Sequence, residues 1–342
     1  MATIAQARET IVSTVVSGFP ISWLHRATGT RLIVPYYHVV SDYNLSHVEH
    51  LYKYKTPRQF EDDLHFLLKH YQPLDLLDVL SRMKSGRPLP KRAFLLTFDD
   101  GYREIYDVVA PVLMRKGISA TFFVNTAFID NTELCYLNKV SILVEHLAKV
   151  RPTVERQLLA LLRAHNIRCD NATAGLVSLK YAQRDLLAQL ADVMRVDFND
   201  YLIKHQPYLT SANINSLIKD GFTIGAHSID HPLYSALSLT EQLRQTVESV
   251  VGVRQMFQLS YGVFAFPHSD HNVTKEFFDT LSSLGVVDLS FGTAGLIRDS
   301  APNHIQRFSL EKPLHSAQRI IAFQYARQLR NLLKMSPAII RS

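Results

Sequence analysis

The stretch Ala93–Gly101 is AFLLTFDDG, and it decides the fold. An almost uninterrupted apolar run ends abruptly at Asp99, Asp100 and Gly101. Such a run bounded by turn residues is typical of a strand buried on both faces. One interpretation of the acidic pair is a simple turn in which an Asp caps the next helix. Two carboxylates directly after a buried strand exceed what a turn needs, so a functional role is favoured.

Outward from this stretch, apolar strands alternate with amphipathic helices. A strand is predicted on each side, and each is separated from AFLLTF by a segment with helical spacing. Thr56 and Pro57 begin the first helix, and Gly117 ends the second. The alternation predicts an α/β fold with parallel strands, the two flanking strands being Arg31–Val40 (RLIVPYYHVV) and Ser119–Val124 (SATFFV).

Residues 131–209 break this rhythm, because they show helical periodicity without a convincing strand and are therefore predicted to be a helical insertion. The alternation then resumes, and Ser238 with Glu241 predicts a capping box. The expected organisation is a helical lead-in at 1–30, a catalytic domain at 31–312 and a basic amphipathic helix within 313–342. The later elements are a helix at Ser211–Lys219 and strands at Phe222–Gly225, Val263–Phe266, Val286–Phe291 and His304–Leu310.

Composition excludes several classes of protein. The 342 residues are 47% hydrophobic and 20% charged, which excludes wholesale disorder and collagen-like repeats. The net charge is +6 without a run of five basic residues, so nucleic acid is not an expected partner. Cys135 and Cys169 cannot form a disulfide framework and fit a reducing compartment. No apolar run reaches about 18 residues, and Ile11–Val16 does not resemble a secretory signal, so a cytoplasmic location is expected.

Three polar clusters follow three predicted strands. They are Asp99–Asp100, then His227 with His231, and then His268 with Asp270 and His271. The carboxyl ends of parallel strands share one face, so the clusters are expected to converge. A His-x-x-x-His pair alone is weak in a chain with 15 histidines, but two imidazoles and a carboxylate form a standard catalytic zinc set.

The motifs TFDDG at 97–101 and HSIDH at 227–231 resemble the NodB-homology polysaccharide deacetylases, carbohydrate esterase family 4. The resemblance covers roughly Arg31–Glu311 without the insertion. It implies a distorted (β/α) barrel of about seven strands, with Asp99 as the catalytic base. It further implies that Asp100, His227 and His231 hold a divalent metal, with Zn²⁺ the expected ion, and that the Ser228 hydroxyl steadies their loop.

The family's third motif is matched only in part. Phe266–Pro267–His268 has a histidine in place of the expected aromatic residue, and Gly262 occupies the position of an expected arginine. Pro267, His268 and Asp270 are the predicted substrate-binding residues. Tyr37–His38 resembles a first-strand motif of poly-N-acetylglucosamine deacetylases, which makes His38 the predicted general acid. The alternatives are a hydrogen-bonded core role for His38, and His271 or His304 as the acid.

The expected function is metal-dependent hydrolysis of an amino-sugar N-acetyl group in a saccharide or lipid-linked glycan, which releases acetate. The alternatives are an inactive saccharide-binding module, an O-acetyl esterase, and a glycoside hydrolase that uses paired carboxylates. The basic helix expected at Ser316–Met335 carries Arg319, Arg327 and Arg330. A solvated face is the favoured explanation of these charges, and peripheral membrane contact is the other.

Overall fold

The computed structural model describes residues 20–333 and 338–342, which divide into two compact units. Unit 1 contains the described residues up to Asp42, Tyr54–Thr126 and the described residues from Ser211 onward. Unit 2 contains Tyr43–Lys53 and Ala127–Thr210. Of the predicted lead-in, the run Ile11–Val16 lies outside the described residues.

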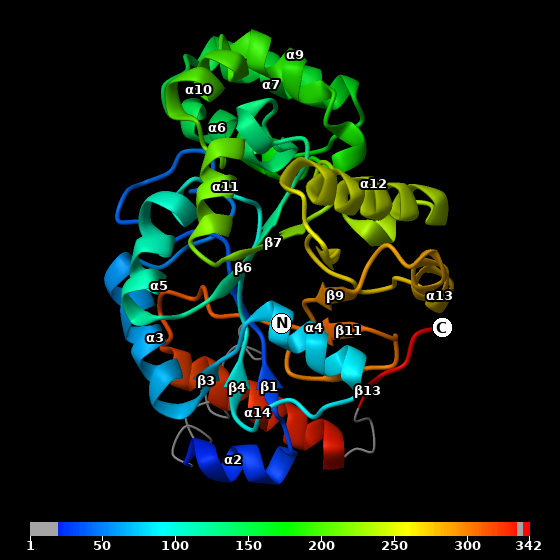
Figure 1. Ribbon diagram of the computed structural model, residues 1–342. Helices are drawn as coiled ribbons and strands as arrows, with labels where there is room; N and C mark the ends of the chain where they lie inside the picture. The colour runs from blue at the N-terminus through cyan, green and yellow to red at the C-terminus, as the bar shows by residue number, and fades with distance from the viewer. Residues whose placement is uncertain (1–19, 334–337) are drawn as a thin grey trace. The chain divides into compact units, whose positions relative to one another are not determined.

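Unit 1 is built on a parallel barrel, shown in Figure 1. Its strands are paired in the order β11-β9-β8-β7-β6-β5-β2-β12. The strands are β2 (Pro35–Tyr37), β5 (Leu96–Phe98), β6 (Ala120–Val124), β7 (Thr223–Ala226), β8 (Val263–Ala265), β9 (Leu289–Gly292), β11 (His304–Gln306) and β12 (Phe308–Ser309).

The two edge strands of this sheet belong to one stretch of chain. β11 pairs with β9, and β12 pairs with β2, while only Arg307 separates β11 from β12. The stretch His304–Ser309 therefore closes the barrel, and the eight strands come from seven chain segments. This confirms the predicted (β/α)7-type barrel, although the strand expected at His304–Leu310 is interrupted at its centre.

Helices surround the barrel strands. Thr56 accepts a hydrogen bond from Gln59 N–H in a capping box that starts α3, and Gly117 ends α5 with a φ of 62°. The Ser238 hydroxyl caps α12 as predicted. Two short helices, α4 and α13, were not predicted. The helices are α2 (Ile21–Thr28), α3 (Pro57–His70), α4 (Leu76–Ser85), α5 (Ala110–Lys116), α11 (Ser211–Lys219), α12 (Leu239–Phe257), α13 (Lys275–Leu284) and α14 (Ala317–Leu333).

Short strands accompany the barrel at the amino-terminal side of β2 and β5. Val34 and Leu95 each interrupt a predicted strand, so the chain leaves one small sheet and enters the barrel. That sheet has the order β1-β4-β3, and a second small sheet pairs β10 with β13. The strands are β1 (Leu32–Ile33), β3 (Gln72–Pro73), β4 (Ala93–Phe94), β10 (Arg298–Asp299) and β13 (Ala338–Ile339).

The regular elements of unit 2 in its described residues are helices, as the periodicity of 131–209 predicts. Leucines from its helices form the buried core. The unit also includes Tyr43–Lys53, whose place there was not predicted. Asn138 Nδ2 donates to the carbonyl of His47 (2.7 Å), and Ser141 Oγ donates to that of Ser46 (2.7 Å). The helices are α6 (Tyr136–Leu147), α7 (Pro152–Ala164), α8 (Ala172–Val177), α9 (Leu186–Met194) and α10 (Phe198–His205).

Across the described ranges, no helix combines the length and the apolar character that a bilayer span requires. The last predicted helix is observed as α14, but its expected end at Met335 lies outside the described residues.

A buried ion pair joins three segments of unit 1 behind β2. The Lys55 ammonium donates to the Asp63 carboxylate, and both residues are buried. Tyr37 OH donates to the same carboxylate (2.8 Å), and Ala317 N–H donates to its second oxygen (2.9 Å). The pair therefore fixes α3 and the start of α14 against the strand that precedes His38.

We expect Lys55→Met to lower the free energy of unfolding by about 3–5 kcal/mol, because it leaves the Asp63 carboxylate buried without a counter-charge. Urea unfolding measures the change. The matched control is Lys275→Met, which removes an exposed Lys275–Asp279 pair and should cost at most about 1 kcal/mol. Equal losses in the two variants would show that burial does not increase the contribution of the Lys55–Asp63 pair to the free energy of unfolding.

Candidate active site

The predicted site residues meet at the carboxyl ends of the barrel strands. Asp99 and Asp100 follow β5, His227 follows β7, and His38 follows β2. Because the paired strands are parallel, these ends share one face of unit 1. Residues that lie far apart in the sequence can therefore form a single site.

Three potential metal-ligand atoms converge there. Asp100 Oδ1 lies 3.1 Å from His231 Nε2 and 3.4 Å from His227 Nε2. His227 Nδ1 is 2.8 Å from the carbonyl oxygen of Ala265, which can only accept. The proton of a neutral His227 therefore sits on Nδ1, and the Nε2 lone pair faces a carboxylate oxygen.

This arrangement leaves the negative charge of a buried carboxylate oxygen without a hydrogen-bond donor in the described part of the chain, and a cation would compensate that charge. Asp100 Oδ1 is buried and has no hydrogen-bond partner among the described residues. Burial opposes ionisation, but the nearby imidazoles of His231 and His227 hold the pKa of Asp100 well below its usual range. Two imidazoles and one carboxylate fit a divalent transition-metal ion of the zinc type.

The backbone at this site adopts conformations that L-residues seldom populate. φ is 70° at Asp100, 69° at Ser228, 64° at His231 and 55° at His268. Left-handed non-glycine residues cost free energy and gather at functional sites. Gly101 also has a positive φ, and a Cβ there would lie 3.0 Å from a side-chain carbon of Val124.

Polar contacts hold the histidine loop in this conformation. The Ser228 hydroxyl accepts a hydrogen bond from His231 N–H (3.0 Å), the geometry that its predicted steadying role requires. Asn125 Nδ2 donates to the carbonyl of His227, and Gln245 Oε1 accepts from Ile229 N–H (3.0 Å). Asn125 and Gln245 were not predicted, because nothing in their local sequence indicates this contact.

Asp99 is held by an arginine that the sequence analysis did not identify. Arg307 Nη1 and Nη2 donate to the two Asp99 oxygens at 2.7 and 2.8 Å, and both side chains are buried. Burial opposes ionisation, but the guanidinium holds the pKa of Asp99 below its ordinary value. Asp99 is therefore an oriented carboxylate that stays ionised at neutral pH.

Arg307 supplies the guanidinium that the partial third motif lacks. Gly262 cannot be occupied by a larger residue, because a Cβ there would lie 2.3 Å from the carbonyl oxygen of Val286. The guanidinium instead reaches Asp99 from the break between β11 and β12. The available signal was a lone arginine within the predicted strand at His304–Leu310.

His38 is paired with a second unpredicted residue, Glu311. His38 Nδ1 lies 2.6 Å from Glu311 Oε2, while Oε1 accepts from the N–H groups of His38 (3.0 Å) and Val39 (2.7 Å). Burial disfavours the charged ring, but the Glu311 carboxylate prevails and raises the pKa of His38 to about 9. The hydrogen bond fixes Nδ1 as the donor, so Nε2 is the nitrogen positioned to exchange a proton with a substrate.

The other candidates occupy different surroundings. His268 is at the surface with its ring 4.5 Å from that of His231, and Pro267 is buried beside it. His304 is buried and contacts Ser290 Oγ (2.8 Å), whereas His271 is exposed. Neither of the alternative acids shares the Glu311 contact of His38.

Asp270 requires a correction. Its predicted substrate contact is contradicted by its burial, because its carboxylate accepts hydrogen bonds from Arg341 and from Gln306 Nε2 (2.5 Å). His304 Nε2 is 3.2 Å from the same carboxylate. Asp270 thus anchors the loop that carries Pro267 and His268 to Arg341 and Gln306.

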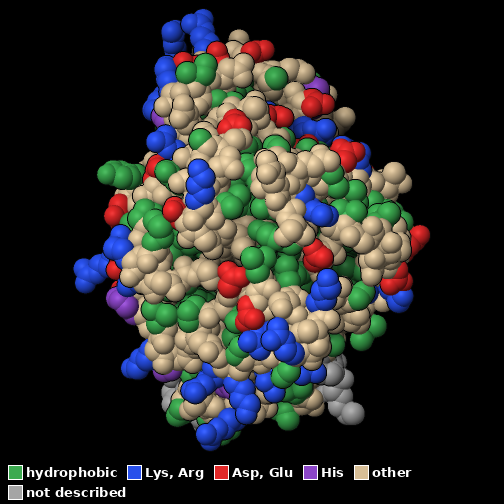
Figure 2. Space-filling view, viewed as in Figure 1, with side chains coloured by type: hydrophobic (Ala, Val, Ile, Leu, Met, Phe, Trp, Pro, Cys, Tyr) green, Lys and Arg blue, Asp and Glu red, His purple; other side chains and the backbone are tan. Residues whose placement is uncertain are grey.

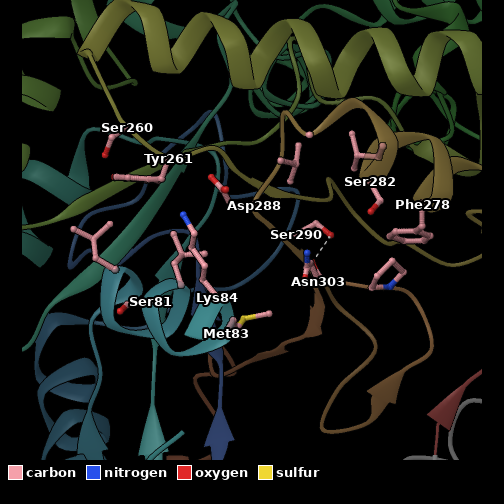
Figure 3. Close-up of a pocket in the computed structure, with 16 residues that line it drawn as sticks. Ser81, Met83, Lys84, Ser260, Tyr261, Phe278, Ser282, Asp288, Ser290 and Asn303 are labelled. Carbon is pink, nitrogen blue, oxygen red and sulfur yellow. Dashed lines mark hydrogen bonds between the residues drawn. The ribbon is translucent and has the colours of Figure 1, made fainter. Parts of the chain in front are cut away.

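A pocket of about 610 Å³ lies at the other end of the strands, away from these residues. Figure 3 shows its lining from α4, including Lys84, and from the segments that precede β8 and β9, including Tyr261 and Asp288. The pocket contains none of the predicted site residues, so it is not the site described above.

Comparison with known sequences identifies the family. The model of the polysaccharide deacetylase family matches residues 86–287, which include TFDDG and HSIDH. The chain therefore belongs to the polysaccharide deacetylase family. This confirms the resemblance on which the assignment of the site residues was based.

Curated relatives share shorter stretches with this chain. A poly-β-1,6-N-acetyl-D-glucosamine N-deacetylase of Escherichia coli K12 is 44% identical over 43 residues, 13% of this chain and 6% of that protein. A Staphylococcus epidermidis protein of the same name is 33% identical over 86 residues, 25% of this chain and 30% of that protein. The matched stretches thus span less than a third of either relative.

Solved structures share the fold at low sequence identity. The Streptococcus pyogenes deacetylase PplD superposes with a TM-score of 0.55 and 14% identity, covering 86% of this chain and 98% of that chain. A de-N-acetylase from Aggregatibacter actinomycetemcomitans gives the same TM-score and identity, covering 86% and 100%. These likenesses support the barrel architecture.

We expect Arg307→Met to lower the free energy of unfolding at neutral pH by about 3–5 kcal/mol, because the Asp99 charge remains buried without its counter-charge. In the parent protein, the lowered pKa of Asp99 gives stability that is present above the unfolded pKa and lost as the pH falls through the folded pKa. Burial raises the pKa of Asp99 in the variant, so the deficit should shrink on acidification.

Chemical unfolding at several pH values measures this difference. Arg244→Met, which removes exposed ion pairs to Glu241 and Glu248, is the matched control. A deficit for Arg307→Met that is constant between neutral and acidic pH would contradict the assigned coupling.

Proposed function

We propose that this chain hydrolyses the N-acetyl group of an amino sugar within a saccharide, with a divalent metal held by Asp100, His227 and His231. The observation that carries the proposal is the approach of both imidazole Nε2 atoms to one buried oxygen of Asp100. The names of the curated relatives favour a substrate that contains N-acetylglucosamine.

A bound zinc ion would supply a water whose pKa is near 7, in contrast to about 15.7 in bulk. The chain's own residues must then orient that water and the acetyl carbonyl. Asp99 follows β5 immediately before Asp100, and its contact with Arg307 fixes the direction of its carboxylate. We assign Asp99 to the acceptance of the proton of the attacking water.

His38 is assigned to the leaving group. Amide hydrolysis requires a proton on the departing nitrogen, because an amide anion is a poor leaving group. The pKa of about 9 keeps His38 protonated at neutral pH, and Glu311 holds the ring so that Nε2 is the proton donor. An ester substrate has a better leaving group and depends less on this proton.

The contacts of the acidic pair disfavour a glycoside hydrolase. That reaction needs two carboxylates that flank one glycosidic bond as acid and as base or nucleophile. Here Asp99 is engaged by Arg307, and Asp100 faces two histidines. The two carboxylates therefore have separate partners and separate roles.

Acetate release from N-acetylated oligosaccharides, assayed with metal-free and zinc- or cobalt-loaded protein, tests the proposal. We expect acetate release only with metal. Sugars without an N-acetyl group should release no acetate, and O-acetylated analogues should release it slowly or not at all. Metal binding without acetate release would instead support a saccharide-binding module. Preferential O-deacetylation would identify an esterase.

Variants separate the roles of the metal ligands and the base. We expect Asp99→Asn to lower kcat about 10²–10⁴-fold with retained metal stoichiometry, because it removes the proton acceptor and leaves the three ligand residues in place. His231→Gln should lose metal and activity together, because it removes a ligand. Metal analysis and acetate assays measure both, with exposed His271→Gln as the control. Full metal occupancy in His231→Gln would refute the ligand assignment.

The Glu311–His38 contact predicts a shift in the pH profile. Since Glu311 raises the pKa of His38, the Glu311→Gln variant should lose activity at a lower pH on the alkaline side. The expected displacement is about 1–3 pH units in kcat. The matched control is Glu145→Gln, which alters an exposed glutamate–histidine contact in unit 2. An unchanged alkaline limb in Glu311→Gln would exclude His38 as the group that controls it.

A further inference from the structure

Unit 1 carries a cluster of exposed basic side chains near the amino-terminal ends of its barrel strands. We call this cluster the basic end. Figure 2 shows Lys and Arg side chains gathered where Figure 1 places α2 and α14. The basic end comes from α2 and the turn after it, from the segment before β4, and from the last turns of α14, and it consists of Arg26, Arg31, Lys91, Arg92, Arg327 and Arg330.

Hydrogen bonds connect the three segments of the basic end. Arg92 N–H donates to His25 Nε2 (3.2 Å), which joins the segment before β4 to α2. Thr30 Oγ1 donates to Gln328 Oε1 (2.9 Å), which joins the turn after α2 to α14. Burial and the neighbouring positive charges of Arg92 and Lys91 lower the pKa of His25. The segments therefore contribute to one positive field.

The charges of the basic end are not neutralised within the described part of the chain. None of its six side chains forms an ion pair with a described carboxylate, whereas Arg82, Arg103 and Arg244 elsewhere on unit 1 each do. Like charges gathered without counter-ions repel one another. An anionic surface would relieve this repulsion.

The same two helices expose apolar side chains. Trp23 on α2 is 50% exposed, and Leu333 at the end of α14 is 86% exposed. Basic residues beside tryptophan and leucine match a bilayer, whose surface combines anionic headgroups with an apolar interior. A nucleic acid would use the charges but offers no partner for Leu333. We propose that the basic end docks unit 1 onto an anionic phospholipid bilayer.

Strand direction fixes how the docked unit is oriented. The basic end includes residues before β1 and β4, whereas Asp99 and His227 follow the carboxyl ends of β5 and β7. The two surfaces therefore lie at opposite ends of the barrel. On the basis of the proposed function, a docked enzyme would direct its site away from the lipid, toward a saccharide chain in the aqueous phase rather than a sugar at the headgroups.

Trp23 provides a direct probe, because it is the only tryptophan in the chain. The full-length protein is titrated with phosphatidylcholine vesicles, with or without about one third phosphatidylglycerol, in low and high salt. We expect a blue shift of tryptophan emission and co-sedimentation with the anionic vesicles only, weakened by salt. The triple variant Arg26→Gln/Lys91→Gln/Arg330→Gln should partition about 100-fold less strongly.

The control removes equal charge from unit 2. Arg156→Gln/Arg163→Gln/Arg168→Gln alters three exposed arginines and should leave partitioning within about twofold of the parent protein. Equal loss in the two triple variants, or no binding to anionic vesicles, would overturn the proposal. Tighter binding to duplex DNA than to these vesicles would also overturn it, in favour of a nucleic-acid partner.

A separate measurement tests the orientation. With the parent protein fully bound to anionic vesicles, release of acetate from a water-soluble N-acetylated oligosaccharide should stay within about twofold of its rate without vesicles. Inhibition on binding would overturn the outward-facing orientation. Because partitioning is measured without substrate, failure of the deacetylase proposal would leave the docking result intact.

Discussion

The contact between Arg307 and Asp99 links the closure of the barrel to its chemistry. Arg307 interrupts the segment whose two halves pair with opposite neighbours, and its guanidinium lies 4.8 Å from the ring of Tyr36 and 5.3 Å from that of Phe123. A buried guanidinium is costly unless a carboxylate and further acceptors satisfy it. Asp99, Thr97 Oγ1 and the carbonyl of Gly292 provide these acceptors. Correct closure and correct orientation of Asp99 therefore require the same contact.

The remaining site is stable only with further compensation. Four of its non-glycine residues have positive φ, and two histidine nitrogens face one buried carboxylate oxygen. A purely structural cluster would be expected to relax toward ordinary φ values and complementary donors and acceptors. A hydrogen bond donated by Asn125 and hydrogen bonds accepted by Ser228 and Gln245 instead maintain the loop. Backbone strain of this kind is typical of functional sites, and it is consistent with the metal site proposed above.

Sequence sufficed for the features that depend on local pattern. The acidic pair and the two histidines each come after an apolar strand, so strand direction predicts that they converge. The resemblance to the deacetylase family then assigned Asp100, rather than Asp99, to the ligand set. Arg307 and Glu311 were missed because their partners, Asp99 and His38, lie 208 and 273 residues away. Asp270 was misplaced because its position near His268 in sequence does not indicate its contact with Arg341. Only tertiary packing determines these three contacts.

Asp99 and His38 illustrate how one barrel face can support opposite proton roles. Both groups lose hydration, which favours a neutral carboxyl and a neutral imidazole. Each is paired with a buried residue of opposite charge, Asp99 with Arg307 and His38 with Glu311. Asp99 therefore remains ionised and His38 remains protonated at the same pH. Arg307 and Glu311 both come from the closing segment and the residues directly after it. The closing segment thus determines that Asp99 is ionised and His38 is protonated, which are the charge states that the proposed proton roles require.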